Sequence, residues 1–257
     1  MGKREIRLKR EQIYEGYQIL VNTTYPLKEK NEKNNPQISP VAVDKRWPEV
    51  TVEWKTARML QAALEAAGAA GQIVPVSGYR SLAEQRQIYA DSLAENGEEF
   101  TRKYVALPNT SEHQTGLAID LGEMAEEIDF VRPYFPDTGV CGRFKALAAD
   151  YGFIQRYEES KEVITGIACE PWHFRYVGWP HARMMKRYGW CLEEYVEHLK
   201  DYPWGKGYLD AGGDIRVCYV PAEDSESVIV LEDGWEAEVS GNNGDGFILT
   251  MYREGRV

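Results

Sequence analysis

The stretch Ser111-Glu-His-Gln-Thr-Gly-Leu-Ala-Ile-Asp120 decides how the rest of this sequence is interpreted. It places an imidazole, His113, and a carboxylate, Asp120, on either side of Gly116. After the glycine, apolar residues alternate with small or polar ones, as they do in a half-buried strand. Asp120 falls on the polar face of that strand. Because an acid inside an apolar strand needs a partner, we expect Asp120 to bind something.

A second stretch, Glu170-Pro-Trp-His173, supplies another imidazole and another carboxylate. The residues from Trp172 to Val177 are rich in strand formers, so we expect His173 on a strand. Two neutral nitrogens and one anionic oxygen make three protein ligands with an open fourth position, which is the donor set of a catalytic zinc ion. We therefore predict that His113, Asp120 and His173 bind zinc, although such a set also accepts Co, Ni or Cu.

Glu170 lies three residues before His173, a spacing that puts the two on opposite faces of a regular strand. Pro171 disfavours a helix at Glu170 and removes a donor from the ladder. We therefore expect a loop or bulge that turns the Glu170 carboxylate back toward the metal. There it would act as the general base. The alternatives are a surface acid or a hydrogen-bond partner of a metal ligand.

Three further polar residues are candidates for binding substrate. Arg80 follows a predicted strand in the turn Gly78-Tyr-Arg-Ser81, where it would stabilise an oxyanion or bind a carboxylate, unless it forms a surface salt bridge. Gln85 and Ser111 are candidates for a substrate's terminal carboxylate, with a helix surface and a turn cap as their alternatives. The remaining histidines, His181 and His198, fit structural or solvent-exposed positions.

Composition excludes several classes of protein. The 257 residues carry a net charge of -11, from 30 basic and 41 acidic residues, which argues against nucleic-acid binding. No apolar run is long enough to span a membrane, and the charged N-terminus lacks the apolar region of a secretory signal. As written, the protein is expected to be cytoplasmic; the alternative is export or membrane anchoring through a segment that has been removed.

Four scattered cysteines form no CxxC pair, so neither a disulfide framework nor a cysteine-zinc site is indicated. We expect reduced and mostly buried thiols. Cys169 directly precedes Glu170 and could instead line the site.

Hydrophobic periodicity and turn residues predict the order of elements. Helices are expected over 51–67, 82–95, 144–151 and 180–202, the last interrupted near Gly189. Strands are expected over 17–22, 72–77, 117–121 and 172–177, with a strand pair inside 153–169. Residues 1–15 are a charged lead-in, 28–40 a surface loop and 203–214 a linker. Four strands follow, over 215–220, 227–231, 236–239 and 247–252. We predict a catalytic domain over 1–205 and a small antiparallel β appendage over 206–257.

Three blocks of this sequence, Ser77–Ser81, Ser111–Leu121 and Glu170–Gly178, resemble the zinc D-alanyl-D-alanine carboxypeptidases of the VanY and VanXY type. These belong to the LAS metallopeptidase group, together with lysostaphin and hedgehog-type domains. The resemblance implies an α+β fold with a central antiparallel sheet flanked by helices, and zinc held by His113, Asp120 and His173.

The same resemblance implies roles for the other candidates. Glu170 would be the catalytic base and Arg80 the stabiliser of the transition state, while Gln85 and Ser111 would lie near the terminal carboxylate of the substrate. The sequence shows no membrane anchor and adds a C-terminal β unit. The missing anchor favours the cytoplasmic VanXY type, which trims D-Ala-D-Ala dipeptide and pentapeptide precursors in vancomycin resistance.

The leading hypothesis is a zinc-dependent D,D-peptidase whose partner is a small peptide ending in D-Ala. An L,D-carboxypeptidase acting on tetrapeptide stems would use the same site. A hypothesis from another class is a non-catalytic, zinc-bearing module that binds cell wall or peptide. The presence of Glu170 and Arg80 argues against that module, because binding alone needs neither a base nor an oxyanion clamp. Substrate length and oligomeric state stay open.

Overall fold

The computed structural model describes residues 4–28 and 40–255, and it divides into two compact units. One comprises Val21–Cys191, and the other combines Met1–Leu20 with Leu192–Val257. The segment 192–205 therefore groups with the C-terminal strands. The expected domains, 1–205 and 206–257, stay a prediction about independent folding, which compactness alone does not test.

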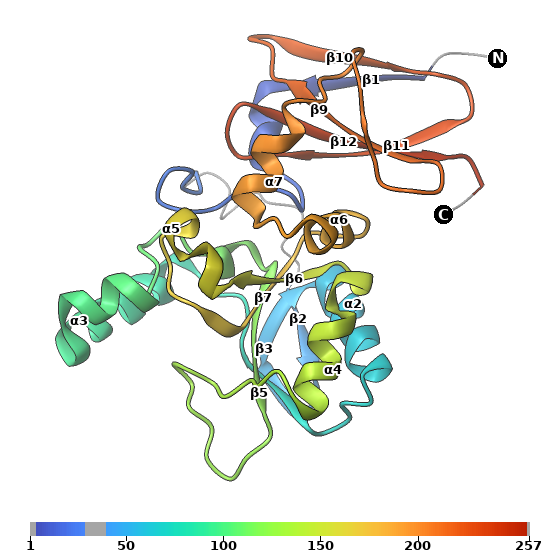
Figure 1. The fold of residues 1–257 in the computed structure, drawn as a ribbon. Helices are drawn as coiled ribbons and strands as arrows, with labels where there is room; N and C mark the ends of the chain where they lie inside the picture. The colour runs from blue at the N-terminus through green and yellow to red at the C-terminus, as the bar shows by residue number, and fades with distance from the viewer. Residues whose placement is uncertain (1–3, 29–39, 256–257) are drawn as a thin grey trace. The chain divides into compact units, whose positions relative to one another are not determined.

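The unit Val21–Cys191 is built on a four-stranded antiparallel sheet, in agreement with the predicted α+β fold (Figure 1). Its strand order is β4 (Ile73–Ser77), β5 (Ala118–Glu123), β7 (Glu170–Tyr176) and β6 (Phe153–Tyr157). Pro75 lies in the edge strand β4, the position in which a missing backbone donor is tolerated.

Helices and one hairpin complete this unit. The hairpin pairs β2 (Pro40–Asp44) with β3 (Trp47–Glu53). The helices are α2 (Trp54–Ala66), α3 (Leu82–Tyr104), α4 (Gly139–Ala148), α5 (Glu162–Thr165) and α6 (His181–Tyr188). Helix α2 packs on α4. Phe174 of β7 makes edge-on ring contacts with Phe144 of α4 and with Phe135, which places an aromatic core on one side of the sheet.

Local sequence signals explain where helix α3 begins and bends. Ser81 is its N-cap: the Ser81 hydroxyl accepts from the backbone N–H of Glu84, and the Glu84 carboxylate accepts from the backbone N–H of Ser81. Gly97 has φ 79° and breaks the helical geometry, so α3 consists of two helical segments that meet at a kink there. The predicted helix 82–95 is thus confirmed, and the second helical segment, which follows Gly97 and reaches Tyr104, was not predicted.

The second unit is mainly antiparallel β structure, as the predicted four C-terminal strands required. One sheet has the order β11 (Trp235–Gly241), β12 (Gly246–Arg253), β9 (Ile215–Pro221) and β8 (Leu209–Asp210). A second pairs β1 (Arg4–Lys9) with β10 (Glu226–Leu231). Helix α7 (Leu192–Leu199) also belongs to this unit and is separated from α6 near Gly189, as expected.

Four expectations about elements were wrong. Residues 17–22 form no strand, because their backbone groups bond instead to the loop near Ser240 and Asn242. The segment 153–169 contains only one strand, since Glu159–Lys161 begins a 3-10 helix that α5 continues. The lead-in 1–15 contains β1, and the linker 203–214 contains β8. The surface loop predicted over 28–40 lies almost wholly outside the described residues.

No helix among the described residues combines the length and the apolar character required to cross a bilayer. The four cysteines are free, as expected, and Cys141 and Cys218 are fully buried. Cys169 is partly exposed and is absent from the lining of the cavity described below.

Thiol labelling tests this arrangement. Burial raises the pKa of Cys141 to about 11 and that of Cys218 to about 12, so neither offers thiolate at pH 8. We expect Ellman's reagent to modify Cys169 first in the folded protein and all four thiols after unfolding in denaturant. A Cys169→Ser variant should lose the fast phase. Rapid modification of Cys141 or Cys218 in the folded chain would contradict the burial.

Candidate metal centre

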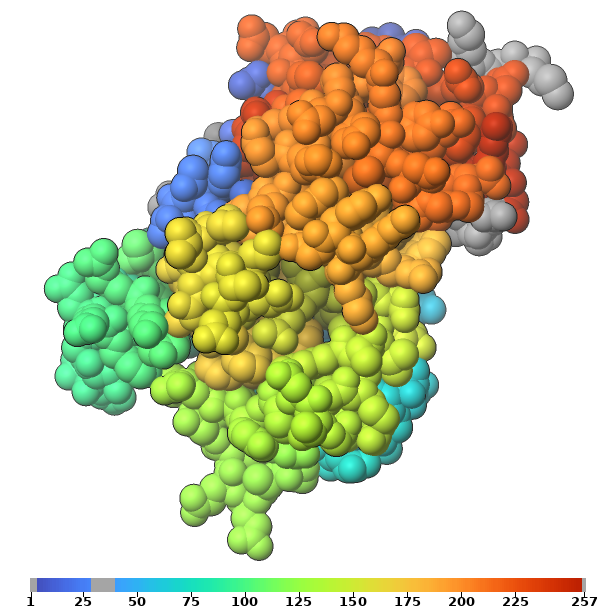
Figure 2. Space-filling view, in the orientation of Figure 1, coloured from blue at the N-terminus to red at the C-terminus, as the bar shows by residue number. Residues whose placement is uncertain are grey.

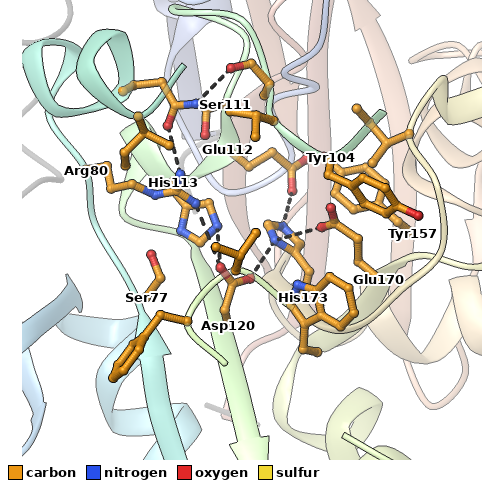
Figure 3. A pocket seen from close by; sticks show the side chains of 18 residues that line it. Ser77, Arg80, Tyr104, Ser111, Glu112, His113, Asp120, Tyr157, Glu170 and His173 are labelled. Carbon is orange, nitrogen blue, oxygen red and sulfur yellow. Dashed lines mark hydrogen bonds and ion pairs between the residues drawn. The ribbon is translucent and has the colours of Figure 1, made fainter. Parts of the chain in front are cut away.

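The three predicted metal ligands come from three different elements and meet at one point (Figure 3). His113 lies on the 3-10 helix η2 (Glu112–Thr115), Asp120 on β5 and His173 on β7. Asp120 is the register partner of His173 in the antiparallel β5–β7 pair, so the two side chains stand next to each other. One candidate ligand atom from each of the three residues lies within 4.8 Å of the other two.

Two glycines let η2 and the β4–α3 turn approach this point. Gly116 ends η2 with φ 71°, and its carbonyl accepts from the backbone N–H of Glu53. Gly78 leaves no room for a side chain, because a Cβ there would lie 2.1 Å from the carbonyl oxygen of Thr51. The carbonyl of Gly78 faces His113.

Hydrogen bonds assign the ring nitrogens of the two histidines. Nδ1 of His113 donates to the carbonyl of Gly78 at 2.7 Å, which leaves Nε2 free to face Oδ2 of Asp120 at 3.2 Å. His173 is turned the other way: its Nδ1 faces Oδ1 of Asp120 at 2.9 Å, and its Nε2 faces Glu112. A zinc ion therefore fits the donor set of Nε2 of His113, Nδ1 of His173 and the Asp120 carboxylate.

Burial and neighbouring charges set the protonation of this group in the metal-free chain. Burial lowers the pKa of His113 to about 4, helped by the charge of Arg80. Burial also acts to lower the pKa of His173, but hydrogen bonds to Asp120 and Glu112 outweigh it and raise that pKa to about 9. A metal cation would take the place of the proton on Nδ1 of His173.

Glu170 reaches the same point through an irregularity in β7. Gln155 pairs with Phe174, and Tyr157 pairs with Glu170. Two steps along β6 therefore lie opposite four steps along β7, so β7 has two extra residues between these pairs. This bulge brings Oε2 of Glu170 to 3.7 Å from Nδ1 of His173. Glu170 is thus part of the strand rather than of a loop, and the expected bulge is present. Burial raises the pKa of Glu170 to about 8.

Arg80 approaches the centre from the opposite side. Its Nη2 lies 3.8 Å from Oδ2 of Asp120, and its Nη1 donates to Oε1 of Gln85 at 3.0 Å. Gln85 is fully buried and donates in turn to the carbonyl of Ala106. Ser111 is also buried, and its side chain does not cap η2. The structure therefore brings all seven predicted site residues to one place.

Comparison with known proteins identifies the family. The family model described as "VanY: D-alanyl-D-alanine carboxypeptidase" matches residues 49–179. A relative from Enterococcus gallinarum, the bifunctional D-Ala-D-Ala dipeptidase and D-Ala-D-Ala carboxypeptidase VanXYC, is 42% identical over 70% of this chain and 93% of its own length. The chain belongs to the VanY family. The family predicted from the three sequence blocks is therefore confirmed.

Solved structures of VanY-type peptidases agree with the fold. The vancomycin resistance D,D-dipeptidase VanXYg, in complex with a D-Ala-D-Ala phosphinate analogue, is 48% identical, with a TM-score of 0.93 over 98% of this chain and 100% of that one. That match extends through the C-terminal β strands. A D,D-pentapeptidase VanY from a VanB-type resistance cassette, in complex with Zn(II), is 28% identical, with a TM-score of 0.56 over 70% of this chain and 98% of that one.

A cavity of about 240 Å³ opens on the metal centre (Figure 3). Its polar wall carries the three predicted metal ligands together with Glu170, Arg80, Gln85 and Ser111. Its apolar wall is formed by side chains of α3, β7 and the loops near them: Ile88, Tyr104, Phe130, Val131, Ile167 and Trp172. Phe130 and Val131 belong to the segment between β5 and α4, which projects as a loop in Figures 1 and 2. An apolar pocket with a few convergent polar groups is typical of a small-molecule site.

Three residues of this site were missed by sequence reasoning. Glu112 is buried, and its Oε1 accepts from Nε of Arg156 at 2.8 Å and forms an ion pair with Nη1 of Arg175 at 2.9 Å. Its Oε2 lies 3.4 Å from Nε2 of His173. The one available signal was strand alternation, which places Arg175 on the same face as His173. Glu112 gave no such signal, because a neighbour of His113 in sequence need not contact His173.

Zinc binding should stabilise the chain. A ligand at 100 times its dissociation constant contributes about 2.7 kcal/mol to the free energy of unfolding, which corresponds to a rise in Tm of about 5–10 °C for a unit of this size. We expect chelator to reverse the rise, as measured by scanning calorimetry. The shift should persist in the His198→Ala variant and disappear in His113→Ala. An equal shift in both variants would place the stabilising metal elsewhere.

Proposed function

We propose that this chain is a zinc-dependent D,D-peptidase that removes the terminal D-Ala from D-Ala-D-Ala dipeptide, from peptidoglycan pentapeptide precursors, or from both. One observation carries the proposal: a buried two-histidine, one-aspartate set, the buried Glu170 carboxylate and the partly buried Arg80 guanidinium converge on one cavity. Hydrolysis of this terminus would lower the amount of precursor that vancomycin recognises.

Zinc is the cofactor that these residues would hold, through His113, Asp120 and His173. When bound, zinc lowers the pKa of water and polarises a carbonyl group. Two imidazoles and one carboxylate would supply three protein ligands, the number that a catalytic zinc site uses. The opposite orientations of the two imidazole rings support this assignment, because each ring points a different nitrogen at the Asp120 carboxylate.

Glu170 would serve as the general base and then as the general acid. It takes a proton from the attacking water and gives it to the amine of the departing D-Ala. Its pKa of about 8 in the metal-free chain shows how strongly burial favours the protonated form, and a nearby dication shifts that balance back toward carboxylate. A carboxyl group poised near neutral pH can both accept and release a proton.

Arg80 would stabilise the oxyanion that forms at the scissile carbonyl. Gln85 holds its Nη1, while Nε is buried without a hydrogen-bond partner among the described residues. A buried guanidinium N–H that aims at no protein acceptor is suited to an oxygen of the substrate. Nη2 of the same guanidinium lies 3.8 Å from Oδ2 of Asp120, so the Arg80 side chain stands beside the proposed metal ligands.

Ser111 and Gln85 would contribute to the terminal carboxylate of the substrate in different ways. The Ser111 hydroxyl lines the cavity and can donate to that carboxylate. Both polar atoms of the Gln85 amide are engaged, with Arg80 and with Ala106. Gln85 therefore acts on the substrate through Arg80 rather than by direct contact.

A substrate panel tests the proposal. We expect the zinc-loaded protein to release D-Ala from D-Ala-D-Ala or from a pentapeptide ending in D-Ala-D-Ala, and chelator to abolish the release. Free D-Ala can be measured with a coupled D-amino-acid oxidase assay. Release from a tetrapeptide stem alone would instead identify an L,D-carboxypeptidase. Tight zinc binding with no cleavage of any peptide would identify a binding module.

Replacing the proposed base separates catalysis from metal binding. Glu170→Ala should lower kcat by about 10²–10⁴-fold, because proton transfer then relies on water alone. Zinc content, measured by inductively coupled plasma mass spectrometry, should stay at the level of the unmodified chain. Glu158→Ala removes an exposed acid nearby and should leave both quantities unchanged. Loss of bound zinc in Glu170→Ala would show that Glu170 is a ligand and not the base.

A further inference from the structure

A buried group of charges lies next to the proposed metal centre, and one of its members, Glu112, lines the cavity. Glu112, Arg156 and Arg175 expose 1%, 1% and 0% of their surface. Arg156 comes from β6 and Arg175 from β7, and both contact Oε1 of Glu112, the first residue of η2. Two cations thus share one oxygen of a single carboxylate. The other oxygen, Oε2, faces Nε2 of His173.

The two proposed histidine ligands are oriented by different acceptors. His113 donates its Nδ1 proton to a backbone carbonyl, that of Gly78. His173 has a carboxylate on each side, Asp120 at Nδ1 and Glu112 at Nε2. Only the Asp120 side belongs to the proposed metal set. A neutral imidazole carries one N–H, so the acceptor at Nε2 determines whether the lone pair of Nδ1 is available to a metal.

We propose that Glu112 is a positioning residue for the metal: it accepts the Nε2 proton of His173 and thereby presents Nδ1 as the ligand. Arg156 and Arg175 hold the Glu112 carboxylate in place and leave only Oε2 for the imidazole. A carboxylate that accepts from a metal-binding imidazole fixes its tautomer and raises its basicity. This inference rests on the proposed zinc site.

The variant Glu112→Gln tests the inference with little change in shape. An arginine side chain offers only hydrogen-bond donors, so Arg156 and Arg175 should donate to the carbonyl oxygen of the new amide. The amide NH2 is then left facing Nε2 of His173, where it favours the tautomer with its proton on Nδ1. That proton occupies the metal-facing nitrogen. We expect the dissociation constant for zinc, measured by competition with a chromophoric chelator, to rise about 10–100-fold.

Glu53→Gln is the matched control. Glu53 is also fully buried, and its side chain caps helix α2 by accepting from the backbone N–H of Thr56. Its replacement removes a buried carboxylate of the same size from the same unit, so general destabilisation should appear in both variants. Zinc affinity should fall only in Glu112→Gln. An equal affinity in the two variants would overturn the inference.

A second measurement needs no variant. In chain labelled with ¹⁵N-histidine and loaded with zinc, long-range ¹H–¹⁵N spectra report which ring nitrogen carries a proton. We expect His173 to carry it on Nε2 and to exchange it with water far more slowly than the half-exposed His198. The opposite tautomer, or exchange as fast as that of His198, would overturn the inference even if Glu112→Gln failed to fold.

Failure of the role proposed for Glu112 can be distinguished from failure of the proposed zinc site. If the unmodified chain bound no zinc, or if His113→Ala and Asp120→Ala kept their zinc, the proposed function would fail. If the unmodified chain bound zinc tightly through those ligands and Glu112→Gln bound it equally well with the same His173 tautomer, only the role of Glu112 would fail.

Discussion

The antiparallel pairing of β5 with β7 is the constraint on which the rest of the site depends. It sets Asp120 opposite His173, although the two residues are 53 positions apart in the sequence. A slip of one residue would send either side chain to the other face of the sheet. Phe174 would then face the cavity and His173 the aromatic core. The apolar packing of Phe174 against Phe135 and Phe144 therefore fixes the register that the metal centre needs.

The regular β5–β7 pairing and the irregular β6–β7 pairing position different residues of the same site. The β5–β7 pairing is regular over Ala118–Asp120, which fixes one edge of the metal centre. The β6–β7 pairing is interrupted between Gln155 and Tyr157, which lets Glu170 reach the face of His173 despite a spacing of three residues. A uniformly regular sheet would keep the proposed ligand and remove the proposed base. The bulge thus allows the two functions to occupy one strand.

Local patterns predicted much of this structure, and non-local contacts account for the rest. The Ser81 cap, the strand alternation before Asp120 and the Pro171 irregularity depend on residues that are near neighbours in the sequence, so all three were predictable. Strand β1 was missed because its pairing with β10 is decided more than 200 residues away. The apolar run at residues 17–22 is buried without a strand ladder because Asn242 and Ser240 satisfy its backbone. Glu112 was missed for the same reason, since its partners lie on β6 and β7.

The ion triad of Glu112, Arg156 and Arg175 links the stability of this unit to the orientation of the His173 ring. Removing one partner from a buried charge group costs about 3–5 kcal/mol, because the remaining charges lose their compensation. A packed apolar group would avoid that cost, so stability alone gives no reason to bury three charges here. The triad joins η2 to β6 and β7, the elements that surround His173. Turning the His173 ring would break its contact with a Glu112 carboxylate that two buried arginines hold in place, so the triad favours the ring orientation seen here.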